Sequence, residues 1–108
     1  MENKLKEAMD ESIENWEGRL SYALAYPTAR LFKTEFIYNK DCPLCRETMG
    51  KCILCPIVRV SKATHCYGTP YVHVIMALDS YEPTGKNVAP FVQKEVDFLK
   101  EVRAKVYG

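Results

Sequence analysis

The stretch NVAPFVQKEVDFLKEVRAKV, residues 87–106, decides the fold class expected of this chain. Apolar side chains recur in it at every third or fourth position, and lysine, glutamate and aspartate occupy the opposite face. The apolar stripe is formed by Val88, Phe91, Val92, Val96, Leu99, Val102 and Val106. Because this spacing matches the 3.6-residue turn of an α-helix, the stretch predicts an amphipathic helix that packs against a partner.

The N-terminal segment has the same periodicity and predicts that partner. Its stripe consists of Leu5, Met9, Ile13, Trp16, Leu20 and Leu24. Pro27 ends the pattern, because the residue before a proline avoids the helical backbone conformation. Gly18 lies inside the pattern and costs about 1 kcal/mol relative to alanine, so a break into two shorter helices is the alternative. We expect the two terminal helices to pack together.

Residues 30–41 and 71–78 carry weaker signals. Phe36 and its neighbours favour extended structure, so the first segment predicts a short strand or arm. The second segment has two interpretations. Thr69 and Pro70 form a typical helix start, whereas the sequence YVHVI is rich in strand-forming residues. A helix is favoured, and in it the inward side chains would be Val72, Ile75 and Met76.

These patterns together predict a mainly α fold of amphipathic N- and C-terminal helices around a cysteine-rich metal-binding loop. An α+β fold with a short strand or hairpin is the alternative. At 108 residues the chain, residues 1–108, is expected to form a single domain. Its apolar runs fall far short of the roughly 20 residues that a membrane span needs, and its acidic N-terminus lacks the apolar core of a secretory signal. We therefore expect a cytoplasmic protein.

All five cysteines lie in DCPLCRETMGKCILCPIVRVSKATHC, residues 41–66. They form two C-x-x-C pairs and one later thiol, namely Cys42, Cys45, Cys52, Cys55 and Cys66. Two thiolates at this spacing approach one ion from the same side, and two such turns complete a tetrahedral zinc shell. In a reducing cytosol, clustered cysteines are more often metal ligands than disulfides, and five thiols cannot all pair within one chain. The segment predicts one structural Zn²⁺ that staples residues 41–71 as an insert.

The sequence leaves open which cysteines bind the ion. Only six residues separate the two pairs, fewer than the roughly 15–20 of a zinc ribbon. A set of Cys42, Cys45, Cys55 and Cys66 with Cys52 spare is therefore an alternative to the two pairs. His65 is a further candidate ligand, although it is adjacent to Cys66.

Two redox interpretations compete with zinc. An iron–sulfur cluster also takes four cysteines, and Cys55-Pro56 matches the Cys-Pro that closes a bacterial ferredoxin motif, but the C-x2-C-x2-C run is missing. A redox-active dithiol would need a βαβ context that the chain lacks.

His73 lies in an apolar run and is interpreted as a core or boundary residue. No catalytic constellation is identified, so we do not expect an enzyme.

Nucleic-acid binding is the main functional alternative to protein binding. The chain carries a net charge of only +1, but residues 40–62 contain five basic side chains against two acidic ones. The basic residues are Lys40, Arg46, Lys51, Arg59 and Lys62. This excess is weaker than the basic patch typical of a nucleic-acid-binding domain.

The order of motifs resembles small cysteine-rich proteins of unassigned function encoded by bacteriophages and prophages. The residues that carry the resemblance are Trp16-Glu17, Cys42-Pro43-Leu44-Cys45, Cys52-Ile53-Leu54-Cys55-Pro56, Cys66-Tyr67-Gly68-Thr69-Pro70-Tyr71 and Glu95-Val96-Asp97-Phe98-Leu99. The resemblance covers most of the chain and implies a phage-encoded protein in the bacterial cytoplasm. It implies no particular activity. We expect a zinc-binding phage accessory protein that acts as a protein-interaction module for a host or phage target.

Overall fold

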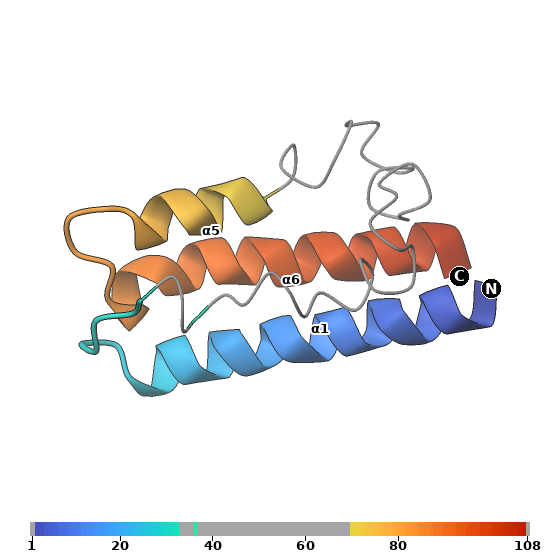
Figure 1. Ribbon diagram of the computed structural model, residues 1–108, viewed down its shortest axis with the longest axis horizontal. Helices are drawn as coiled ribbons and strands as arrows, with labels where there is room; N and C mark the ends of the chain where they lie inside the picture. The colour runs from blue at the N-terminus through green and yellow to red at the C-terminus, as the bar shows by residue number, and fades with distance from the viewer. Residues whose placement is uncertain (1, 33–35, 37–69, 108) are drawn as a thin grey trace.

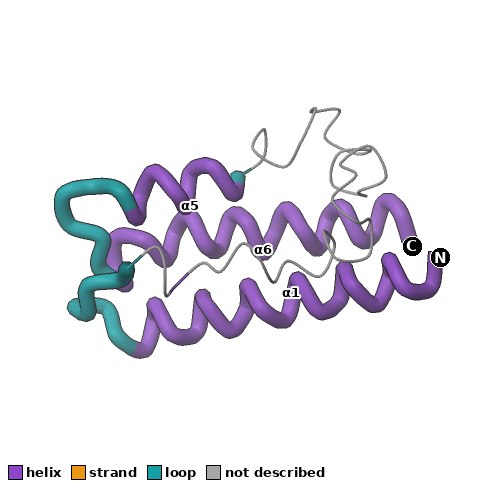
Figure 2. Tube along the Cα trace, viewed as in Figure 1, coloured by secondary structure: helices purple, strands orange, loops and turns teal. Residues whose placement is uncertain are grey.

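The computed structural model describes residues 2–32, 36 and 70–107 of the chain. In these residues three helices are present: α1 (Glu2–Ala25), α5 (Tyr71–Leu78) and α6 (Gly85–Tyr107). The helices α1 and α6 run antiparallel along each other, and α5 lies against α6 (Figure 1). Figure 2 shows only helices and loops in the described part, which confirms the mainly α fold.

The core of the described residues lies between α1 and α6 and under α5. It consists of Leu5, Ala8, Met9, Ile13, Trp16, Ala23, Leu31, Val74, Leu78, Val88, Ala89, Val92, Val96, Leu99 and Val102. Removing these side chains from water is the main stabilising contribution to such a fold. Although α1 and α6 each exceed 20 residues, no described helix is long and apolar enough to cross a membrane.

The N-terminal helix largely follows the sequence pattern. It ends at Ala25, two residues before Pro27, as predicted. It is continuous through Gly18, because its packing along α6 offsets the low helix propensity of one glycine. The expectation that Leu24 faces the core is wrong, since Leu24 is 62% exposed and Ala23 is fully buried instead. The buried face of the helix therefore continues from Leu20 to Ala23, three residues later, and not to Leu24.

The segment that begins at Tyr71 is a helix and not a strand. Its N-cap is Pro70, while Thr69 lies outside the described residues. The prediction that Met76 faces inward is wrong, because this side chain is 63% exposed. Val74 and Leu78 are the buried pair, four residues apart on the line where α5 touches α6. Val72 and Ile75 are partly buried.

His73 also departs from its sequence interpretation. It was expected in the core or at its boundary, but it lies on the exposed side of α5. The physical reason is that an eight-residue helix packed mainly against α6 buries only a narrow stripe. The residues beside that stripe therefore remain accessible, whatever their local hydrophobicity.

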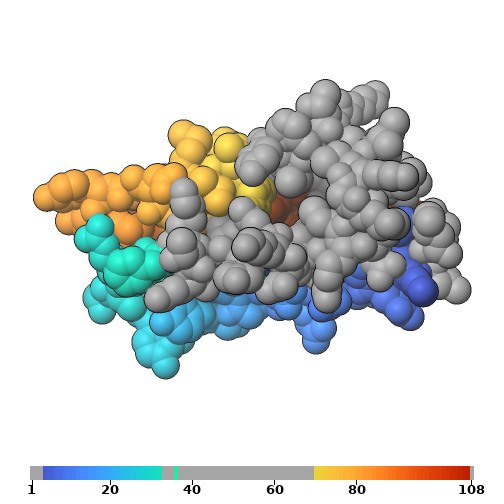
Figure 3. All heavy atoms as spheres, in the orientation of Figure 1, coloured from blue at the N-terminus to red at the C-terminus, as the bar shows by residue number. Residues whose placement is uncertain are grey.

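The segment after α1 hydrogen-bonds to the start of α6. The amide of Gly85 donates to the carbonyl of Ala29 at 3.0 Å, and the amide of Lys86 donates to Pro27 at 2.9 Å. These bonds satisfy two of the amides that a helix start leaves unpaired, so α6 begins at Gly85, two residues before the stretch that predicted it. Figure 3 shows the segment after α1 and the turn before α6 together at one end of the molecule.

Strand structure in this region is limited to one bridge. Arg30 and Thr84 form an isolated antiparallel bridge, and no sheet occurs among the described residues. The Phe36 amide donates to the Phe32 carbonyl at 2.7 Å, the spacing of a helical turn. The predicted extended conformation is therefore wrong at Phe36, and residues 33–35 and 37–41 lie outside the described residues.

Candidate functional site

The residues of the predicted metal site lie outside the described residues. This applies to Cys42, Cys45, Cys52, Cys55, Cys66 and His65. It applies equally to the basic residues of the nucleic-acid alternative, Lys40, Arg46, Lys51, Arg59 and Lys62. Within residues 2–32, 36 and 70–107, no group of three or more histidine, aspartate or glutamate side chains could hold a metal ion. The zinc site therefore remains a prediction from cysteine spacing.

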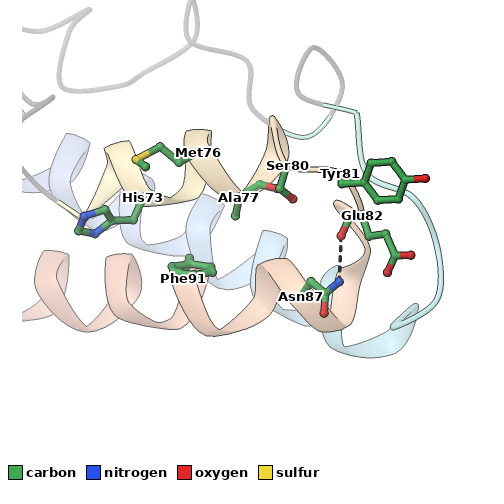
Figure 4. A pocket seen from close by; sticks show the side chains of 8 residues that line it. All are labelled: His73, Met76, Ala77, Ser80, Tyr81, Glu82, Asn87 and Phe91. Carbon is green, nitrogen blue, oxygen red and sulfur yellow. Dashed lines mark hydrogen bonds between the residues drawn. The ribbon is translucent and has the colours of Figure 1, made fainter.

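A groove of about 540 Å³ lies beside α5, α6 and the turn that joins them. It is lined by His73, Met76, Ala77, Ser80, Tyr81, Glu82, Asn87 and Phe91. Figure 4 shows Phe91 of α6 pointing toward α5, with His73 near one end and Asn87 near the other. The groove thus joins three elements of the described fold.

The groove is mainly apolar, and most of its polar lining residues, namely Ser80, Glu82 and Asn87, lie at the end next to the turn between α5 and α6. Met76 is 63% exposed and Tyr81 is 92% exposed, which are high values for large apolar side chains. At the polar end, the side-chain amide of Asn87 donates to the Glu82 carbonyl at 2.9 Å (Figure 4). Exposed methionine and tyrosine side chains next to an apolar groove are typical of surfaces that bind other proteins.

A cluster of charged and aromatic side chains lies where the helices meet. The rings of Trp16 in α1 and Tyr71 in α5 meet edge to face, with centroids 5.9 Å apart. The guanidinium carbon of Arg19 lies 4.6 Å from the centroid of the Trp16 ring. Glu95 of α6 is only 3% exposed and interacts electrostatically with Arg19. The cluster therefore combines a cation, two rings and a buried carboxyl.

Glu95 is an unusual member of this cluster, because burial raises the pKa of its carboxyl to about 7. The positive charge of Arg19 opposes this change in pKa without overcoming it. The Oε1 atom of Glu95 has no hydrogen-bond partner among the described residues. A group so enclosed can hold or release a proton, but a substrate cannot reach it. We interpret Glu95 as a proton-linked structural residue.

Sequence reasoning placed Glu95 on the polar face of α6, which the structure contradicts. A signal was present in the sequence. Glu95 follows Val92 by three residues and precedes Leu99 by four, the spacing of side chains that share one helix face. The charge of Glu95 predicts an exposed position, whereas its spacing from Val92 and Leu99 predicts a buried one.

Comparisons with known proteins add no assignment. No protein-family model, curated protein or solved structure matches the chain.

Proposed function

We propose that this chain is a small zinc-binding module that binds another protein. The observation that carries the proposal is the pair of C-x-x-C motifs followed by Cys66, all within residues 41–66. A full thiolate shell leaves no open position for water, so the zinc has a structural role. A chain of this size has a modest core, and metal binding adds directly to its folding free energy.

The groove beside α5 and α6 is the surface that we propose for the partner. Exposed Met76 and Tyr81 give it large apolar side chains that protein interfaces favour, and Phe91 forms an apolar wall. The helix α5 begins at Tyr71, the last residue of the proposed zinc-bound insert. An insert ordered by zinc would therefore hold the start of the helix that carries Met76.

The resemblance to phage-encoded proteins supplies the proposed setting. An accessory protein that acts in the bacterial cytoplasm meets host and phage proteins, and either class offers apolar side chains or amphipathic helices to such a groove.

The metal part of the proposal is tested by measuring metal content on protein purified without added metal, together with a count of free thiols. We expect one zinc per chain, with about one thiol reactive before chelation and all five after it. Iron with acid-labile sulfide would instead assign an iron–sulfur protein. Protein without metal and with oxidised thiols would contradict the proposal.

The binding part is tested by affinity capture of bacterial proteins with the wild type and with Tyr81→Ser. Loss of a captured protein with this variant supports the groove as its site. The matched control is Tyr26→Ser, because Tyr26 is 55% exposed but does not line the groove. Salt-dependent binding to DNA or RNA, with no dependence on Tyr81, would favour the nucleic-acid alternative instead.

A further inference from the structure

A second pocket, of about 450 Å³, lies between α1 and the chain that follows it. The wall from α1 consists of Asn15, Gly18, Arg19 and Tyr22, which are spaced by three, one and three residues and so share one face. The opposite wall consists of Arg30, Leu31, Phe32 and Phe36. The Nε atom of Arg19 donates to the Phe36 carbonyl at 2.9 Å and so joins the two walls.

Gly18 is the first sign that this pocket is built for an occupant. Glycine inside a helix is less stable than alanine, yet α1 is continuous there. A Cβ atom on Gly18 would have no neighbour within 4 Å, so packing inside the described fold does not require glycine. What the missing side chain does provide is open space in the pocket wall.

The charge of the lining is the second sign. Arg19 and Arg30 both line the pocket, and no carboxylate occurs among its described lining residues. Arg19 is held in place by its bond to Phe36 and by its position over the Trp16 ring. Guanidinium groups bind carboxylate and phosphate oxygens through paired hydrogen bonds.

Aromatic rings are the third sign. Tyr22 and Phe32 are each about half exposed, at 49% and 54%, and Phe36 is partly buried. Exposed rings next to cations offer flat apolar surfaces on which a planar ligand can stack. The pocket volume also falls within the roughly 300–1,000 Å³ that small-molecule sites occupy.

We propose that this pocket binds a small planar organic anion, meaning an aromatic ring that carries a carboxylate or a phosphate. The ring lies against Tyr22 and Phe32, and the anion contacts Arg19 and Arg30. Gly18 leaves room for the ring beside α1. This site shares no lining residue with the proposed partner groove. The proposal of an anion site does not depend on the proposed zinc.

The test is a calorimetric titration of the full chain with two pairs of probes. Each pair compares an anion with its neutral counterpart: AMP with adenosine, and benzoate with benzamide. We expect at least one anion to bind about tenfold tighter than its neutral counterpart, the effect of charged hydrogen bonds. Fluorescence of Trp16, the one tryptophan, reports binding because Arg19 lies over its ring. The pair in which the anion binds more tightly shows whether the pocket prefers a phosphate or a carboxylate.

Three variants locate the site. Arg30→Gln removes one cation and is expected to weaken binding of that anion about tenfold. Gly18→Leu fills the open wall and is expected to weaken it at least as much. Lys4→Gln removes the same charge from the far end of α1 and should leave the affinity unchanged.

Two outcomes would overturn the proposal. One is the absence of binding by both anions at concentrations up to about 10 mM. The other is binding that Arg30→Gln leaves unchanged. Circular dichroism shows whether Gly18→Leu folds, and if it does not, the comparison of Arg30→Gln with Lys4→Gln decides, because both side chains are exposed.

Discussion

Gly85, the first residue of α6, lies against the carbonyl oxygen of Ala23 near the end of α1, so that a Cβ atom on Gly85 would be 2.4 Å from that oxygen. The carbonyl oxygen of Tyr26 would be equally close. Both neighbours are backbone atoms, which cannot rotate away as a side chain can. The close approach therefore requires glycine at this position and fixes how the two long helices meet.

Gly85→Ala is expected to destabilise the protein by about 1–3 kcal/mol, because the new methyl group has to push the helix ends apart. Gly18→Ala is the matched control, since both glycines are helical but nothing lies within 4 Å of a Cβ at Gly18. That substitution should stabilise the protein by up to about 1 kcal/mol through helix propensity. Urea unfolding monitored by circular dichroism measures both. Equal stability of Gly85→Ala and the wild type would contradict the close packing.

Stability is expected to depend on pH through Glu95. Burial raises the pKa of this carboxyl from 4.5 to about 7, so the folded protein keeps a proton that the unfolded chain releases. The free energy of unfolding should therefore fall as the pH rises from about 4.5 to about 7 and level off above that. The contribution of this one group is on the order of 3 kcal/mol. Urea unfolding at several pH values across this window measures it.

Glu95→Gln isolates that contribution, because glutamine does not titrate. The difference in unfolding free energy between the wild type and this variant should change across the window in the direction just given. Glu101→Gln is the control, since Glu101 is exposed and forms a surface ion pair with Lys105 at 2.9 Å. A wild type and a Glu95→Gln variant with the same pH profile would show that Glu95 is not buried as a proton-holding group.

The two methionines Met9 and Met76 test the packing of the core. Met9 is fully buried between the helices, whereas Met76 is 63% exposed on α5. Met9→Ala is expected to destabilise the protein by about 2–5 kcal/mol, because it leaves a cavity. Met76→Ala should change stability by no more than about 0.5 kcal/mol. Thermal unfolding of the two variants measures the contrast, and a similar loss in both would argue against the observed orientation of α5.

Removal of the proposed zinc should affect one part of the chain before the rest. Hydrogen exchange with and without a chelator is expected to show faster exchange first in residues 42–71, since metal binding there contributes folding free energy. The core amides of α1 and α6 should respond less, because apolar packing between these helices does not need the metal. Exchange that increases uniformly along the chain, or does not change, would contradict a local zinc staple.

The sequence by itself determined the two long helices, α1 and α6. The three-to-four spacing of Val88, Val92, Val96 and Leu99 predicted α6, and Pro27 predicted the end of α1. These are local properties, because helical periodicity and the backbone preference before proline depend on residues within a few positions of each other. The cysteine spacing is local in the same sense, and it predicts the zinc site without help from the fold.

Only the tertiary structure decided which side chains at the edges of those stripes are buried. Periodicity did not distinguish Ala23 from Leu24, and it did not overrule the charge of Glu95. Burial depends on where a second helix lies, and that information is spread over distant residues. The close approach of Gly85 to Ala23 and the open wall at Gly18 arise in the same way. The sequence does not distinguish the two glycines. Only the neighbours that folding brings near them show that packing requires glycine at position 85, whereas Gly18 leaves a pocket open.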